Sequence, residues 1–286
     1  MDLANYKNAY LTFALSIQQT RVVSMAAGGA LESFPKNLPR AHKDYVVDAS
    51  AKMSEKLKPV MKGVSGSSFE MEFDLDDGNP YLLPLVGILF THVAGLGGSP
   101  NVDYGGLLKA QEVVMLFAHL EAFLADSIRV ICLKEPRVLK KNKKMQWDTI
   151  LECGSWEGVI DKMVDEYVFE AGWGSIKDKI RNMRSAYGLE IGVSDTVLNA
   201  LDAAEQLRNV LVHNGGRVSR EYLERTGRND VRVGDMVPLD GSYIEKLSAT
   251  VTVLGGDVFS AIAVKFFGAR PDELRLVFKG AGTVLE

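Results

Sequence analysis

Cysteine is scarce in this 286-residue chain, which contains only Cys132 and Cys153. Neither thiol belongs to a Cys-x-x-Cys pair or a histidine-rich stretch, so the sequence predicts neither a disulfide framework nor a zinc site. We therefore expect no metal, no cofactor and a reducing, cytoplasmic environment.

The sequence also predicts neither a secretory signal nor a membrane-spanning segment. Residues 1–7 lack a basic region followed by an apolar run. The most apolar window, residues 81–96, is interrupted by Pro84 and Gly87 and is shorter than the roughly 20 residues that cross a bilayer. We expect this window to be a buried helix and expect no membrane contact.

The chain has no excess of positive charge, since 33 Lys and Arg oppose 37 Asp and Glu for a net charge of −4. This balance argues mildly against a protein that coats nucleic acid. One local exception has a single acid, Glu135, among six basic residues: Lys134, Arg137, Lys140, Lys141, Lys143 and Lys144. This run either contacts RNA phosphates or forms a solvated loop between two helices.

Apolar spacing predicts a mainly α fold. We expect an N-terminal, mostly helical region of unknown role over residues 1–100 and a helical domain with a C-terminal extension over residues 101–286. The expected helices cover residues 5–27 (ended by Gly28 and Gly29), 39–61, 105–131, 156–169, 175–186, 195–212 and 242–267. Residues 231–239 are expected to be extended, and residues 273–278 to form a short strand.

One further strand is expected at residues 69–76, where apolar and acidic residues alternate. Its carboxylates would stand about 7 Å apart, which is too wide to clamp one cation unaided. A metal site and a mimic of RNA phosphates are therefore less favoured than an edge strand protected by like charges.

The most informative segment is Leu207–Gly216, which reads Leu-Arg-Asn-Val-Leu-Val-His-Asn-Gly-Gly. Arg208 and His213 lie five positions apart, and on an ideal helix this step corresponds to about 500° of rotation, or roughly 140° between the side chains. Asn214 and the two glycines are typical of a helix end. Ser194 is expected to cap the start of this helix.

This segment resembles the Arg-polar-x3-His signature of the HEPN superfamily, the "higher eukaryotes and prokaryotes nucleotide-binding" domains. Residues 115–126 resemble the first long helix of such domains, and the resemblance covers about residues 105–265. It implies an antiparallel helical bundle and, as in many members, a metal-independent ribonuclease that dimerises so that two Arg/His pairs face one cleft. A HEPN subset has Tyr two residues after the His, where this chain has Gly215, so we do not expect the antitoxin type that is modified there.

The chemistry that the resemblance implies is attack of the ribose 2′-hydroxyl on the adjacent phosphorus, which gives a 2′,3′-cyclic phosphate. Histidine can act as acid or base near neutral pH, so His213 is the candidate acid–base group, while Arg208 would bind phosphate oxygens. Asn209 would bind phosphate or orient the histidine. Glu121 either pairs with Arg208 or is a surface carboxylate, and Asn214 either contacts substrate or only caps the helix.

Because cyclisation needs both a base and an acid, the single histidine of the motif, His213, suggests a homodimer with a composite site. The leading hypothesis is thus an endoribonuclease that acts on RNA as a bacterial toxin or phage-defence effector, with an antitoxin or regulatory protein as a further partner. The alternative is a non-catalytic HEPN-like module that binds RNA, nucleotide or protein. A helical scaffold unrelated to the family is the least favoured interpretation.

Overall fold

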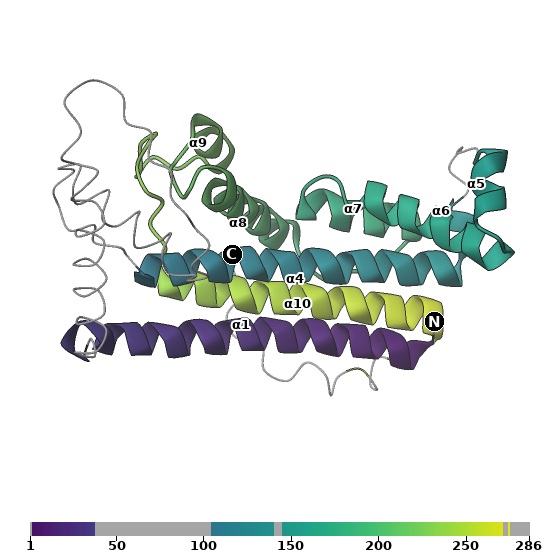
Figure 1. Ribbon diagram of the computed structural model, residues 1–286, viewed down its shortest axis with the longest axis horizontal. Coiled ribbons are helices and arrows are strands. Elements are labelled where there is room, and N and C mark those ends of the chain that lie inside the picture. Colours follow the sequence, from purple (N-terminus) through teal and green to yellow (C-terminus); the bar gives the residue numbers. More distant parts are fainter. Residues whose placement is uncertain (1, 38–103, 140–144, 271–273, 275–286) are drawn as a thin grey trace, which may run out of the picture. The chain divides into compact units, whose positions relative to one another are not determined.

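The computed structural model describes residues 2–37, 104–139, 145–270 and Leu274 (Figure 1). Within these ranges the chain forms α1 (Leu3–Asn37), α4 (Tyr104–Lys134), the 3-10 helix η1 (Pro136–Leu139), α5 (Trp147–Glu152), α6 (Trp156–Ala171), α7 (Ile176–Tyr187), α8 (Asp195–His213), α9 (Arg220–Thr226) and α10 (Gly241–Phe267). The predicted mainly α character is confirmed for this part of the chain. The helix expected at 39–61, the buried helix at 81–96 and the acidic strand at 69–76 lie outside it.

Residues 1–28 and 105–286 form one compact unit, and residues 29–104 form another. This division differs from the expected boundary at residue 100, because the first helix contributes its aromatic side chains to the core of the C-terminal unit. The expected end of that helix at Gly28 is also wrong, since α1 continues to Asn37. Glycine lowers helix stability by about 1 kcal/mol relative to alanine, which weakens a helix without forcing it to end.

Three long helices, α1, α4 and α10, lie together in the first unit (Figure 1), and buried residues of α6 to α9 join their core. Near the start of α1 the ring of Tyr6 stacks on Phe123 of α4 and on Phe267 at the end of α10. Farther along α1, Arg21 pairs with Glu112, which lies near the start of α4. The contacts with α4 therefore move backwards along α4 as α1 advances, so α1 is antiparallel to α4, whereas α4 and α10 run parallel to each other (Figure 1).

Phe13 of α1 lies directly against Gly255 of α10. A Cβ atom built on this residue would lie 2.2 Å from Cε1 of Phe13. The ring of Phe13 is buried and stacks on Phe123 with 4.8 Å between ring centroids. Because Gly255 has no side chain, the ring of Phe13 can pack directly against the backbone of α10.

Helix α10 is long and apolar enough to cross a membrane by length and composition, the one such helix in the described part of the chain. In this protein, 61% of its most apolar window is buried. Leu254, Val258 and Phe259 are in the core with α1 and α4. The core helix of a soluble protein passes the same test of length and composition, so the finding decides nothing about a membrane.

The helices predicted from apolar spacing between residues 105 and 267 correspond to α4, α6, α7, α8 and α10, with ends within three residues of those expected. Serine caps define several of the starts: the hydroxyl of Ser194 accepts from the backbone N–H of Val197, as predicted, and Ser175 and Asp178 form a capping box at α7. Residues 231–239 contain no helix, and Met236 makes an isolated antiparallel bridge with Arg217. The strand expected at 273–278 lies outside the described residues except for Leu274, which is buried.

Candidate functional site

Helix α8 carries the Arg208 to His213 segment and is held by an apolar stripe. Leu198, Leu201, Leu207 and Val210 are buried on the face that packs into the core. The side chain of Arg208 lies at the edge of this face and is 21% exposed. The helix therefore holds the guanidinium where it is partly shielded from water yet still reachable.

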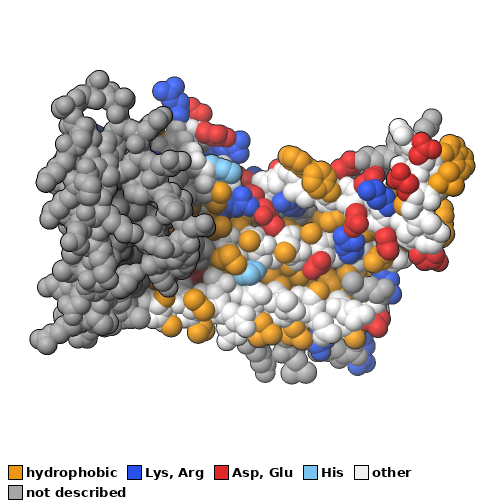
Figure 2. Space-filling view, in the orientation of Figure 1, with side chains coloured by type: hydrophobic (Ala, Val, Ile, Leu, Met, Phe, Trp, Pro, Cys, Tyr) orange, Lys and Arg blue, Asp and Glu red, His pale blue; other side chains and the backbone are white. Residues whose placement is uncertain are grey.

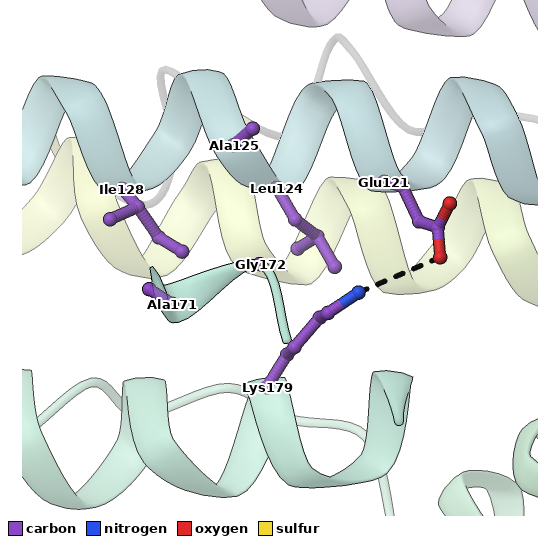
Figure 3. Close-up of a pocket in the computed structure, with 7 residues that line it drawn as sticks. All are labelled: Glu121, Leu124, Ala125, Ile128, Ala171, Gly172 and Lys179. Carbon is purple, nitrogen blue, oxygen red and sulfur yellow. Dashed lines mark ion pairs between the residues drawn. The ribbon is translucent and has the colours of Figure 1, made fainter. Parts of the chain in front are cut away.

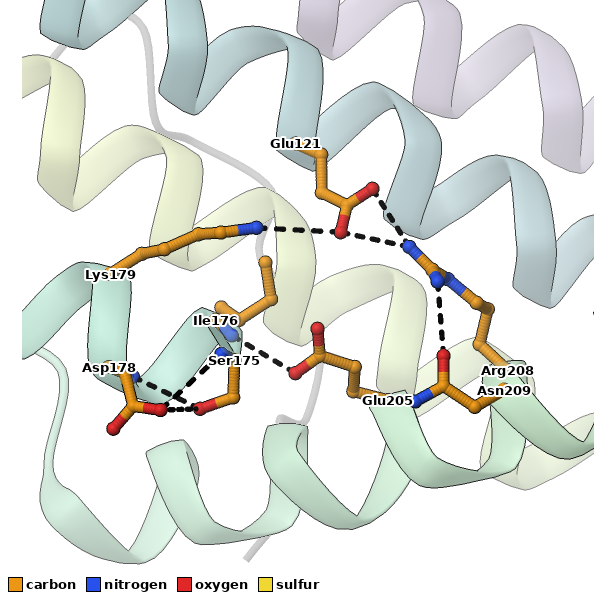
Figure 4. Close-up of polar contacts among 8 residues, drawn as sticks. All are labelled: Glu121, Ser175, Ile176, Asp178, Lys179, Glu205, Arg208 and Asn209. Atoms are coloured by element: carbon orange, nitrogen blue, oxygen red, sulfur yellow. Dashed lines mark hydrogen bonds and ion pairs between the residues drawn. The ribbon is translucent and has the colours of Figure 1, made fainter. Parts of the chain in front are cut away.

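The guanidinium of Arg208 is fixed by two acceptors (Figure 4). Its Nη2 donates to both carboxylate oxygens of Glu121 on α4, at 2.8 Å each, and its Nη1 donates to Oδ1 of Asn209 at 3.0 Å. The pairing of Glu121 with Arg208 that the sequence suggested is thus present. Asn209 contacts the arginine, and its expected contact with the histidine is not found among the described residues.

Two further charged residues complete a cluster with Glu121 and Arg208 (Figure 4). Nζ of Lys179 on α7 lies 3.6 Å from Oε1 of Glu121, and the lysine side chain is only 7% exposed. Oε2 of Glu205 on α8 accepts from the backbone N–H of Ile176 at 3.0 Å, in the first turn of α7. We call Glu121, Lys179, Glu205 and Arg208 the charge cluster.

Burial dominates the electrostatics of Glu205 within the charge cluster. Desolvation raises the pKa of its carboxyl above the ordinary value, and the Ile176 N–H and the nearby Lys179 cation only partly oppose this rise. The shift has the direction expected for a carboxylate whose neighbours do not fully replace water.

The sequence interpretation missed Lys179 and Glu205, although a signal for both exists. Lys179 falls on the apolar stripe of α7 between the buried residues Ile176 and Ile180, and Glu205 falls on the stripe of α8 with Leu198 and Leu201. A charged residue at a position with core periodicity is rarely buried alone, so it indicates an ionic partner on a neighbouring helix.

His213 is the last residue of α8 and has a different environment from Arg208. Its side chain is exposed, and no described residue forms a hydrogen bond or ion pair with it. Asn214 is the C-cap residue and is also exposed, and Gly215 and Gly216 follow with φ of 58° and 79°. These left-handed conformations favour glycine and turn the chain sharply after the histidine.

Exposed apolar side chains lie on the surface near the end of α8 that carries His213. Val212 is 49% exposed, and Val233 and Met236 of the following arm are exposed as well. The arm returns to the end of α8, because the Val237 N–H donates to the Gly216 carbonyl and the Val218 N–H donates to the Asp235 carbonyl. Val210 and Leu211 point into or towards the core instead, so the three apolar residues between the arginine and the histidine divide between core and surface.

A small pocket lies on the other side of Glu121 (Figure 3). Its volume is about 160 Å³, and it is lined by Glu121, Leu124, Ala125, Ile128, Ala171, Gly172 and Lys179. The carboxylate and ammonium form one charged edge of an otherwise apolar hollow. It is smaller than the roughly 300 Å³ at which pockets for drug-sized ligands begin.

The other residues that the sequence analysis singled out lie away from the charge cluster or outside the residues that the structure describes. Lys140, Lys141, Lys143 and Lys144 are not among the described residues. Lys134, at the end of α4, lies over the ring of Phe267 at 4.6 Å from its centroid. Thirteen residues separate it from Glu121, which corresponds to about 20 Å along the helix. His119 is half-buried with Nε2 3.2 Å from Oγ1 of Thr20, and burial lowers the pKa of its imidazole, as expected for a structural histidine.

Within the described residues, no three His, Cys, Asp or Glu side chains come close enough together to hold a metal ion. Cys132 is buried, and desolvation raises the pKa of its thiol to about 12. The charge cluster is of a different kind, because two cations accompany its two carboxylates.

Comparison of the chain with protein-family models, with curated proteins and with solved structures finds no match. The HEPN resemblance therefore depends on the residues of the motif themselves: an arginine held by a carboxylate from α4, and an exposed histidine at the end of the same helix.

Proposed function

We propose that the protein is a metal-independent endoribonuclease whose catalytic residues are Arg208 and His213. The observation that carries the proposal is the contrast between them. Glu121 and Asn209 hold the guanidinium in one position, whereas the imidazole is exposed and has no partner in the described part of the chain. A fixed cation suits a phosphate that gains charge, and a solvated imidazole suits proton transfer.

The contact with Glu121 leaves Arg208 able to bind a phosphate. A guanidinium has five N–H donors. In the described contacts the Nη2 group donates to Glu121, and one Nη1 hydrogen is donated to Asn209. The Nε–H and the second Nη1 hydrogen remain for non-bridging phosphate oxygens, so the side chain can keep its anchor while it binds substrate.

In the proposed reaction one imidazole removes the proton of a ribose 2′-hydroxyl, and the resulting oxygen attacks the adjacent phosphorus. The bond to the 5′-oxygen breaks, and a second, protonated imidazole gives its proton to this leaving group. The products are a 2′,3′-cyclic phosphate and a 5′-hydroxyl, and no metal takes part. Arg208 stabilises the charge that develops on the phosphate oxygens.

One chain does not supply this set of groups. Arg208 and His213 are separated by about 7.5 Å along α8 and by roughly 140° around it, and each chain offers one such histidine. A homodimer with its two-fold axis near the end of α8 would bring two copies of Arg208 and His213 together. The exposed apolar side chains of Val212, Val233 and Met236 support an interface at this place.

The resemblance favours a cytoplasmic bacterial toxin or phage-defence effector that acts on RNA under the control of an antitoxin or regulatory protein. Asn214 lies beside His213 and is a candidate contact for RNA, and the lysines from Lys140 to Lys144 are candidates for additional phosphate contacts. Neither role is needed for the reaction itself.

One observation favours the alternative of a non-catalytic HEPN-like module that binds RNA, nucleotide or protein. Arg208 belongs to the charge cluster, and an arginine that links α4 to α8 has a structural role whether or not it meets a phosphate. Cleavage of RNA in excess chelator separates the two functions.

The test uses total RNA with EDTA and four proteins: the parent, His213→Ala, Arg208→Ala and the control Arg225→Ala. Arg225 is exposed and pairs only with Glu221 within the described residues, on the short helix α9. Loss of the acid–base group is expected to lower the cleavage rate on the order of 10²–10⁴-fold, with the control unchanged. Cleavage by His213→Ala at the parent rate, or a strict need for magnesium or manganese, would eliminate the mechanism.

The composite site has its own test. A fixed amount of parent protein is mixed with an equal amount of His213→Ala under conditions that allow subunit exchange, and the cleavage rate is then measured. If both histidines of a dimer are needed, activity falls to roughly half because half of the parent chains then have an inactive partner. Unchanged activity, or a fully active protein that light scattering shows to be monomeric, would reject the dimer.

A further inference from the structure

All three tryptophans of the chain lie exposed in one segment, which comprises α5, α6 and the turn that follows α6. Trp147, Trp156 and Trp173 are 78%, 70% and 69% exposed, and Leu151 and Phe169 are exposed to a similar degree. Figure 2 shows hydrophobic side chains gathered over α5 at this end of the unit. Tryptophan is seldom left in water without a use, so residues 145–175, which we call the aromatic hairpin, are a candidate interaction surface.

The aromatic hairpin is also the most acidic part of this unit. It holds seven carboxylates and one lysine, a net charge of −6, whereas the entire chain carries −4. Five of the carboxylates have no hydrogen bond or ion pair with any described residue: Asp148, Glu152, Glu157, Asp161 and Glu166. The other two are Asp165, which pairs with Arg129 on α4, and Glu170, which also has an interaction partner.

The acids and the aromatic side chains share faces of the helices. On α6 the positions three and four residues before Phe169 are Glu166 and Asp165, which places both carboxylates beside the ring. The ring of Phe169 meets that of Trp173 edge to face, with 5.9 Å between centroids. Trp156 lies thirteen residues before Phe169, which corresponds to about 20 Å along the helix.

We propose that the aromatic hairpin binds a basic segment of a partner protein that carries both apolar and Lys or Arg side chains. The carboxylates would attract and pair with the cations, and the indole rings would bury the apolar side chains and stack with Lys or Arg. RNA and anionic membranes are repelled by the same charge. The proposal does not depend on ribonuclease activity.

Intrinsic fluorescence tests the proposal directly, because every tryptophan of the protein is in the aromatic hairpin. The full chain is titrated with an amphipathic helical peptide of Leu and Lys, and in parallel with a peptide in which each Lys is replaced by Glu. The expected result is a blue shift of emission with the Lys peptide, weakened by salt, and no shift with the Glu peptide. Equal responses to both peptides would overturn the proposal, as would a response to single-stranded RNA or anionic vesicles in place of the Lys peptide.

Matched charge variants locate the surface. The triple variant Glu152→Gln, Glu157→Gln and Asp161→Asn removes three carboxylates from the aromatic hairpin, whereas Glu190→Gln, Glu224→Gln and Glu245→Gln removes three exposed carboxylates elsewhere. The first is expected to weaken binding of the Lys peptide about tenfold, since the effects of three exposed pairs multiply, and the second to leave it within about twofold. Similar weakening by both triples would show attraction to net charge alone and overturn the assignment. A blue shift that grows with the concentration of the protein by itself would also overturn it, because the occupant would then be a second copy.

Discussion

Replacing Glu121 with glutamine removes the carboxylate that both Arg208 and Lys179 contact. The ammonium of Lys179, whose side chain is 7% exposed, would then remain in a poorly hydrated position. Breaking a fully buried ion pair costs about 3–5 kcal/mol, and breaking an exposed pair costs at most about 1. Glu121 is 32% exposed, so we expect an intermediate loss of about 2 kcal/mol in the free energy of unfolding.

Urea unfolding followed by circular dichroism measures this loss, and a double-mutant cycle with Lys179→Met assigns it to the pair. The two single variants and the double variant should give a coupling of at least about 1 kcal/mol, since the double variant leaves no unpaired ammonium. Asp165→Asn is the exposed control, because Asp165 and Arg129 are 58% and 36% exposed, and its loss should stay below about 1 kcal/mol. An unfolding midpoint for Glu121→Gln equal to that of the parent, or a cycle with no coupling, would refute the reasoning.

Three further predictions follow from packing, titration and capping. Gly255→Ala should destabilise the protein by about 1–3 kcal/mol through overpacking against Phe13. At Gly28 no atom lies within 4 Å of an added Cβ, so Gly28→Ala should stabilise the protein by up to about 1 kcal/mol. Thermal unfolding checks both, since the two variants should shift the melting temperature in opposite directions. Glu205→Gln should be more stable than the parent at pH 7, because burial raises the pKa of this carboxyl and so penalises its ionised form in the folded state. The parent regains this stability as the pH falls through the raised pKa, so the advantage should vanish below its ordinary value of 4.5; a constant advantage in denaturant titrations from pH 7 to pH 4 would contradict this. Ser194→Ala should cost about 1 kcal/mol through loss of the cap on α8, and an unchanged melting temperature would show that the cap contributes nothing.

The parts of the fold that the sequence predicted are those with local causes. Apolar periodicity located α6 and α8, and a serine before an apolar stripe located the start of α8. The end of α1 was wrong for the complementary reason: two glycines are a local signal of a helix end, but local preference is worth about 1 kcal/mol per residue and did not end the helix. The packing of α1 likewise depends on long-range contacts, because Tyr6 and Phe123 meet across more than a hundred residues.

The candidate site divides in the same way. The spacing of Arg208 and His213 follows from one helix and could be read directly, whereas the partners of Arg208 depend on which helix packs against α8. Glu121 is 87 positions away in sequence and was one of two open interpretations until α4 was placed. Lys179 and Glu205 were missed although each charge falls on an apolar stripe, because the stripe indicates that an ionic partner is needed but not which helix supplies it.

The arrangement within one chain also limits what the motif can do by itself. Arg208 is anchored to Glu121 of α4, and His213 lies exposed at the end of α8, about 7.5 Å farther along the helix and roughly 140° around it. We therefore expect that the two side chains of one chain do not meet at the same phosphate while this anchor holds. Cleavage by a single chain would require either release of Arg208 from Glu121 or unwinding of the last turn of α8. Release predicts that Glu121→Gln raises the activity, whereas a composite site predicts that it lowers it, because the anchor then orients Arg208 for the phosphate held by the second copy. The direction of that change in cleavage rate, measured together with the stability of the variant, distinguishes a shared site from a single-chain site that forms by release of Arg208.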